Sequence, residues 1–87
     1  MAHSTLDDIE ISPAWEDVAA THASASEADV RLQNVGPGLI AVVAGGESAP
    51  TGKTGTLLAP CDSVEVNAET IWARSTDSAG RLSVTLL

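Results

Sequence analysis

Length, composition and charge restrict this chain to one small domain, because it has 87 residues and a formal net charge of −8. Residues 1–29 hold seven acids and no Lys or Arg, whereas five acids nearly balance four bases over residues 30–87, so the two parts carry −7 and −1. The bases are scattered, which excludes nucleic-acid binding, and the longest apolar run, six residues at 39–44, is far shorter than the ~18 of a membrane span.

The first part of the chain is expected to be an extended, acidic N-terminal arm over residues 1–28, ahead of a β-sandwich domain over 29–87. Ile9 and Ile11 alternate with polar neighbours, which is typical of a strand that adds to a sheet. The arm therefore supplies one or two added strands in this interpretation.

Two interpretations stay open for residues 15–18. Ser12 and Pro13, followed by Glu16 and Asp17, are typical of a helix start, with a cap, a proline at the first position and acids in the first turn. A strand would instead let Trp15 share an apolar surface with the two isoleucines of the arm, and we favour the strand.

From residue 28 onward the sequence predicts closely spaced strands separated by Gly, Pro and Asp turns. Residues 28–33 and 81–87 alternate between apolar and polar, whereas the continuous apolar run at 39–44 indicates a strand buried on both faces. The expected strands are 28–33, 39–44, 56–59, 64–66, 71–74 and 81–87. Together with the arm they predict an all-β fold, a small antiparallel sandwich or jelly-roll-like barrel of about six to eight strands.

A near-match to a phosphate-binding loop lies at residues 46–54. The motif requires four residues between its glycines, but five separate Gly46 from Gly52, and Glu47 stands where the first glycine belongs. Pro50 removes an amide that would hold the anion, and the following residues, 56–58, indicate a strand where the motif needs a helix. We expect no nucleotide and no other cofactor.

Other reactive side chains do not form a catalytic or metal-binding pattern. His3 and His22 lie in polar segments and are expected to be surface histidines, and Cys61 precedes Asp62, whose charge raises rather than lowers a thiol pKa. One cysteine cannot form an internal disulfide. We expect no catalytic residue, no metal and no enzymatic activity.

The core of this chain must be built without Phe or Tyr, so little apolar area offsets the chain entropy of folding. Association is the remaining source of stability, and we expect an oligomer. Trp72, inside a strand, is expected to fill the core, whereas for Trp15 in the arm packing at an interface is at least as strongly expected as packing in the core.

Candidate partner-binding residues are the apolar side chains of the arm and the arginines at outward strand positions. The arginines either prevent wrong edge pairing or receive the acidic arms of neighbouring copies, and both interpretations stay open. The full set is Ile9, Ile11, Trp15, Val18, Arg31, Arg74 and Arg81.

Turn and strand motifs over residues 15–87 also carry a family resemblance. They are Trp15-x-Asp17-Val18 and the stretches 32–36, 40–43, 48–51, 58–60, 63–66, 71–75 and 80–85. These motifs resemble a group of small virion proteins of tailed phages and prophages. Cys61 departs from the pattern, which has Gly there, and a non-glycine residue strains a turn with positive φ.

The resemblance implies a structural role in a virion: a capsid decoration (cement) protein that binds the outer capsid surface and bridges major capsid subunits through its arm. The expected partners are the major capsid protein and copies of the chain itself, as a trimer by analogy with the three-fold sites of capsid lattices. Residues 1–10 lack the features of a secretion signal, so synthesis is expected in the host bacterial cytoplasm. The alternatives are an adaptor or base domain of a head or tail fibre and, more remotely, a carbohydrate-binding β-module.

Overall fold

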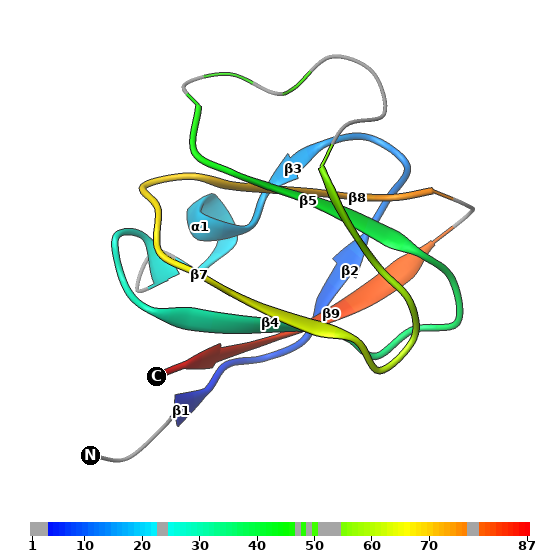
Figure 1. Ribbon diagram of the computed structural model, residues 1–87, viewed down its shortest axis with the longest axis horizontal. Coiled ribbons are helices and arrows are strands. Elements are labelled where there is room, and N and C mark those ends of the chain that lie inside the picture. The colour runs from blue at the N-terminus through cyan, green and yellow to red at the C-terminus, as the bar shows by residue number, and fades with distance from the viewer. Residues whose placement is uncertain (1–3, 23–24, 47, 49, 51–54, 77–78) are drawn as a thin grey trace.

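The structure, a computed structural model, describes residues 4–22, 25–46, 48, 50, 55–76 and 79–87, which form a sandwich of two antiparallel sheets (Figure 1). The elements in chain order are β1 (Ser4–Thr5), β2 (Ile9–Ile11), β3 (Glu16–Asp17), α1 (Val18–Thr21), β4 (Val30–Asn34), β5 (Ile40–Ala44), β6 (Thr56–Leu58), β7 (Ser63–Val66), β8 (Ile71–Ser75) and β9 (Gly80–Leu86).

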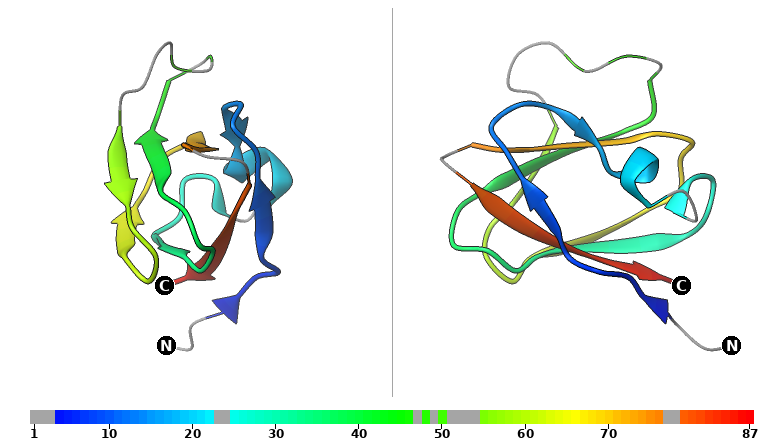
Figure 2. Two further views of the ribbon diagram at one scale, coloured as in Figure 1. Left: turned by 90° about the vertical axis from the view of Figure 1, so that its right-hand side faces the viewer. Right: turned by 180° about the vertical axis from the view of Figure 1, so that it is seen from behind.

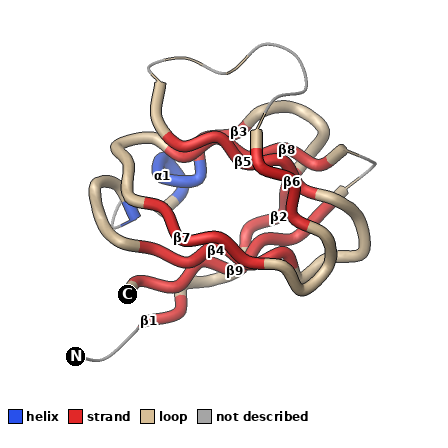
Figure 3. The backbone as a smooth tube through the Cα atoms, in the orientation of Figure 1, coloured by secondary structure: helices blue, strands red, loops and turns tan. Residues whose placement is uncertain are grey.

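One layer, which we call the β9 sheet, has the strand order β1–β9–β4–β7, with β2 also beside β9. Because β1 pairs with Thr85 and Leu86 while β2 pairs with Gly80 to Leu82, these two short strands share one edge, and the sheet is four strands wide. The other layer, the β8 sheet, has the order β3–β8–β5–β6. Figure 3 shows the two layers facing each other without closing into a barrel.

The core fills the space between the sheets, and strict alternation along the strands places it there. On β4, Val30 and Leu32 are buried while Arg31 between them is exposed. On β9, Leu82 and Val84 point inward in the same way. The cluster comprises Ile11, Val18, Ala25, Val30, Leu32, Ile40, Val42, Leu58, Ile71, Ala73, Leu82 and Val84. Each large aliphatic member contributes roughly 1.5–3 kcal/mol by leaving water.

The sandwich prediction is therefore confirmed, and each of the six expected strands is present with ends shifted by no more than about two residues, a shift within the usual uncertainty of strand ends. The alternative of a barrel is not what the chain forms, because the two sheets stay separate.

The N-terminal residues contribute to both layers rather than standing apart from them. β2 pairs with β9 over three residues, whereas β3 pairs with β8 in the opposite sheet (Figure 2). The connection between β2 and β3 is closed by a hydrogen bond of 3.2 Å from Ser12 N to Glu16 Oε2. The expectation of an added strand is met by β2, and the chain crosses between the sheets directly after it.

Residues 15–18 combine the two interpretations left open by the sequence. Glu16 and Asp17 form β3, and a single helical turn begins at Val18. Asp17 is its N-cap, since its Oδ1 accepts a hydrogen bond of 3.0 Å from Ala19 N. The favoured strand forms at residues 16–17. The helix of the alternative interpretation begins at Val18 rather than after Ser12, because Glu16 closes the preceding turn.

Candidate functional site

The two outer faces of the sandwich differ in chemistry. On the β9 sheet the outward side chains are polar or charged, and strand register aligns them in rows such as Thr85–Arg31–Glu65 and Ser83–Gln33–Ser63. Arg31 and Glu65 form an exposed salt bridge of 3.2 Å between Nη2 and Oε2. An exposed pair of this kind contributes at most about 1 kcal/mol, so this face is simply well solvated.

The outer face of the β8 sheet is apolar around one cation. Register places Leu57, Ala41 and Arg74 in one row across β6, β5 and β8. The next row places Val43 beside Trp72, because the inward positions of β8 are taken by Ile71, Ala73 and Ser75. We call this surface the tryptophan face, and it consists of Trp15, Ala41, Val43, Leu57, Trp72 and Arg74.

Arg74 lies at the centre of the tryptophan face and contacts Trp15. Its Cζ is 5.8 Å from the centroid of the Trp15 ring, within the range of a cation–π interaction. Beside it is a cavity of about 100 Å³ lined by Ala41, Leu57, Arg74 and Thr76. Leu57 is the most exposed large apolar residue in the described part of the chain, at 58%. The face thus presents an aliphatic side chain and a guanidinium around one small recess.

Trp72 is held on this face by its indole nitrogen. Nε1 donates a hydrogen bond of 3.3 Å to the carbonyl oxygen of Gly46, which also accepts one of 2.6 Å from Thr70 Oγ1. The prediction that Trp72 fills the core is wrong, because residue 72 has the outward register of β8 and its side chain is only partly buried.

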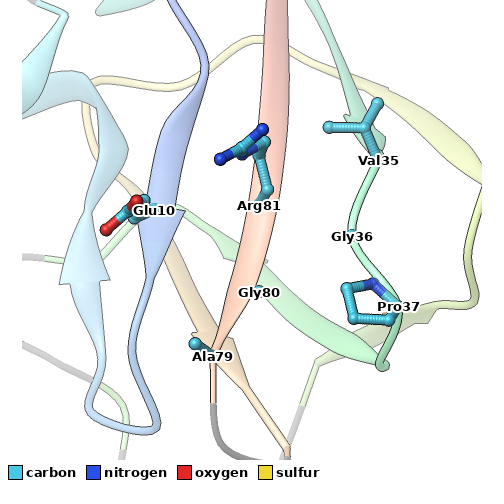
Figure 4. A pocket seen from close by; sticks show the side chains of 7 residues that line it. All are labelled: Glu10, Val35, Gly36, Pro37, Ala79, Gly80 and Arg81. Carbon is cyan, nitrogen blue, oxygen red and sulfur yellow. The ribbon is translucent and has the colours of Figure 1, made fainter.

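A second recess of about 310 Å³ lies where the 35–37 turn passes over the start of β9. Its lining includes Glu10 and Arg81, which are direct cross-strand neighbours on β2 and β9, together with exposed Pro37 (Figure 4). Gly36 comes so close to β9 that a Cβ there would lie 2.8 Å from Arg81 N. The carboxylate of Glu10 and the guanidinium of Arg81 form no salt bridge, so this groove offers an open, polar surface.

The structure separates the predicted partner-binding residues into three groups. Ile11 and Val18 are each 1% exposed in the core, so their prediction as binding residues is corrected: they hold the fold together and offer a partner no surface. Ile9 is partly buried against the same core. Arg31 and Arg81 lie on the outer side of the β9 sheet, whereas Arg74 and Trp15 lie together on the opposite face.

The sequence reasoning missed the outer side chains of β5 and β6. The apolar run at 39–44 was predicted to be a strand buried on both faces, but only Ile40 and Val42 face the core, and Val43 on the outer face is only partly buried. Leu57 follows the same logic, since Leu58 beside it is buried. Two adjacent apolar residues in a strand necessarily point to opposite faces, and that was the available signal.

The histidine, cysteine and phosphate-loop candidates form no catalytic or metal site among the described residues. His22 Nε2 donates a hydrogen bond of 2.8 Å to the carbonyl oxygen of Asp7, and Cys61 is exposed with its thiol free. No three His, Cys, Asp or Glu residues gather as a metal site within the described residues. His3 and much of the 46–54 near-match to a phosphate loop lie outside the described residues, and residues 56–58 after it are the strand β6.

None of the described helices is long and apolar enough to cross a membrane. Comparisons with models of known families, with curated proteins and with solved structures give no match for this chain. The residues themselves therefore carry the functional argument.

Proposed function

We propose that this chain is a structural protein of a tailed-phage virion that decorates the outer capsid surface and docks through its tryptophan face. The contrast between the two outer faces carries this proposal. One side of the sandwich is polar and suits contact with water, while the other carries exposed Leu57 and two half-buried tryptophans around Arg74. Contiguous apolar surface rimmed by polar groups is typical of a protein–protein contact, and Trp and Arg are enriched at the centre of such contacts.

The N-terminal segment has a different role in this proposal from the one expected of a free arm. Because Ile11 belongs to the core and β2 pairs with β9, the segment up to α1 completes the sandwich. Bridging of capsid subunits then depends on the tryptophan face and on contacts between copies, as in the expected trimer. Many symmetric copies on one shell would compensate a modest affinity per copy through avidity.

Copy number and surface variants test the proposal together. On purified virions of the encoding phage, a quantitative gel should show hundreds of copies per particle, whereas about a dozen or fewer would indicate a fibre adaptor. Leu57→Asp should reduce occupancy on stripped particles at least tenfold, since it places a charge in the proposed contact. Ser63→Asp adds the same charge on the exposed edge strand β7 of the other sheet and should leave occupancy unchanged. Equal binding by both variants would refute the tryptophan face as the docking surface.

A carbohydrate-binding module is the second candidate, favoured by the presence of both tryptophans on one outer face. Aromatic side chains and a few polar groups are the usual lining of small-molecule sites. Titration with host surface polysaccharide, followed by tryptophan fluorescence, separates the candidates. A saturable change in fluorescence that Trp72→Ala abolishes would support sugar binding. An unchanged fluorescence spectrum would favour the docking role.

A further inference from the structure

We infer that Arg74 is a carboxylate receptor: the recess beside it binds an Asp or Glu side chain of the capsid protein that docks on the tryptophan face. This inference rests on the proposed function and specifies the chemistry of the partner. Three observations support it: the hydrogen bonding of Arg74, the charges around its guanidinium, and the recess beside it.

The hydrogen bonding of Arg74 is incomplete. Its Nε is buried and has no hydrogen-bond partner, and among the described residues it is the one buried side-chain nitrogen or oxygen in that condition. A buried donor left unpaired is costly, and native structures nearly always satisfy such groups. The Nε–H of an arginine lies at the side of the planar guanidinium from which a carboxylate is bound by two parallel hydrogen bonds.

The charge of Arg74 also has no ionic partner among the described residues. Arg31 has Glu65 as its ionic partner, but within the described residues no carboxylate comes within 4.0 Å of Arg74. Asp17 belongs to the same sheet, yet its Oδ1 already accepts hydrogen bonds from Ala19 N and Ile71 N, at 3.0 and 3.1 Å. Oε2 of Glu16 accepts from Ser12 N. Within the described residues these carboxylate oxygens are engaged elsewhere, which leaves a partner as the source of a carboxylate for Arg74.

The surroundings of the guanidinium would strengthen such a contact. Trp15 lies against one side of the guanidinium, and Leu57 and Ala41 line the recess of about 100 Å³ next to it, which has room for a carboxylate and its immediate water. Once the face is covered, these apolar groups exclude water, and the charge-assisted hydrogen bonds strengthen in the lower dielectric. Thr76 Oγ1 bonds to the carbonyl oxygen of Leu39 at 3.2 Å and adds a polar rim.

Nitrogen-15 spectra of the arginine side chains provide a direct test, because the chain has three arginines, each with one Nε–H signal. The probe is the blocked tripeptide acetyl-Leu-Asp-Leu-amide, with acetyl-Leu-Asn-Leu-amide as the matched neutral control. The aspartate peptide should shift the Arg74 signal in a saturable way and leave those of Arg31 and Arg81 in place. The shift should disappear as the pH falls below about 4, where the aspartate is protonated.

Two variants complete the experiment. Arg74→Lys keeps the charge but lacks the planar fork, and it should bind the aspartate peptide at least tenfold more weakly. Arg31→Gln, on the opposite face, should bind it as the wild type does. An equal response to the asparagine peptide, or no shift at millimolar aspartate peptide, would overturn the carboxylate receptor.

The same variants distinguish failure of the receptor from failure of the proposed function. If Arg74→Lys decorates stripped virions as well as the wild type while Leu57→Asp does not, the carboxylate contact is refuted and docking through the tryptophan face stands. If the Arg74 signal shifts with protein concentration without peptide, and sedimentation shows association, the carboxylate comes from a second copy, which overturns the capsid assignment. If the peptide binds but neither the wild type nor any of the variants binds virions, the proposed function fails.

Discussion

Asn34 Nδ2 donates a hydrogen bond of 2.8 Å to the carbonyl oxygen of Leu58, and this bond joins the end of β4 in the β9 sheet to β6 in the β8 sheet. The same Nδ2 donates to the carbonyl oxygen of Gly38 at 2.6 Å, and Oδ1 accepts from Gly36 N at 3.0 Å. Asn34 is fully buried, and its single amide satisfies three backbone groups: the bond to Leu58 is buried, and the other two are partly buried. The turn between β4 and β5, which carries the chain from one sheet to the other, is organised around it.

Asn34→Ala is expected to lower the free energy of unfolding by about 2–3 kcal/mol, because it leaves one buried and two partly buried backbone groups without this partner. Chemical denaturation followed by circular dichroism measures the change. Ser83→Ala, on the outward side of β9, should change stability by no more than about 0.5 kcal/mol. Similar losses in both variants would show that the Asn34 network is not what supports the turn.

Ile11→Ala is expected to destabilise the fold by about 2–5 kcal/mol, since it empties a fully packed position between the sheets. Its neighbour Glu10 points outward from the same strand, so Glu10→Ala should have little effect. Thermal unfolding of the two variants makes the comparison. If Ile11→Ala melts like the wild type, β2 is dispensable, and the first residues act as an arm after all.

Asp17→Ala is expected to cost about 1–2 kcal/mol, because one carboxylate oxygen caps α1 and also accepts from Ile71 N on β8. Asp17→Asn retains an oxygen that can accept both hydrogen bonds and should lose distinctly less. Hydrogen exchange of the Ile71 amide reports the contact directly: its protection should fall in the alanine variant and largely persist in the asparagine variant. Identical exchange in the two variants would contradict this account.

Cys61→Gly is expected to raise the free energy of unfolding by about 0.5–1 kcal/mol. Cys61 has a φ of 74°, a conformation that costs a residue with a Cβ about 1–2 kcal/mol, and the greater entropy of glycine in the unfolded chain offsets part of the gain. Cys61→Ala keeps the Cβ and should show no gain, which also controls for removal of the thiol. Equal stabilities of the glycine and alanine variants would mean that the turn is unstrained.

The turn at residues 60–63 was readable from its proline and aspartate, although the positive φ of Cys61 within it is a finding of the structure. The strand at residues 30–34 was equally readable, since Val30 and Leu32 alternate with Arg31. In contrast, the sequence did not show on which side of its sheet Trp72 lies. Its strand was predicted correctly, but whether residue 72 faces the core or the solvent depends on which neighbours Ile71 and Ala73 meet, and those contacts are made with distant strands.

The amino-acid sequence by itself determined the strands and the turns, because period-two alternation and Gly–Pro punctuation act within a few residues. Only the tertiary structure decided that residues near the N-terminus complete both sheets and that Trp15 meets Arg74, 59 positions later in the chain. β3 pairs with β8, which is distant from it in the sequence, and local sequence patterns do not specify which strands become neighbours.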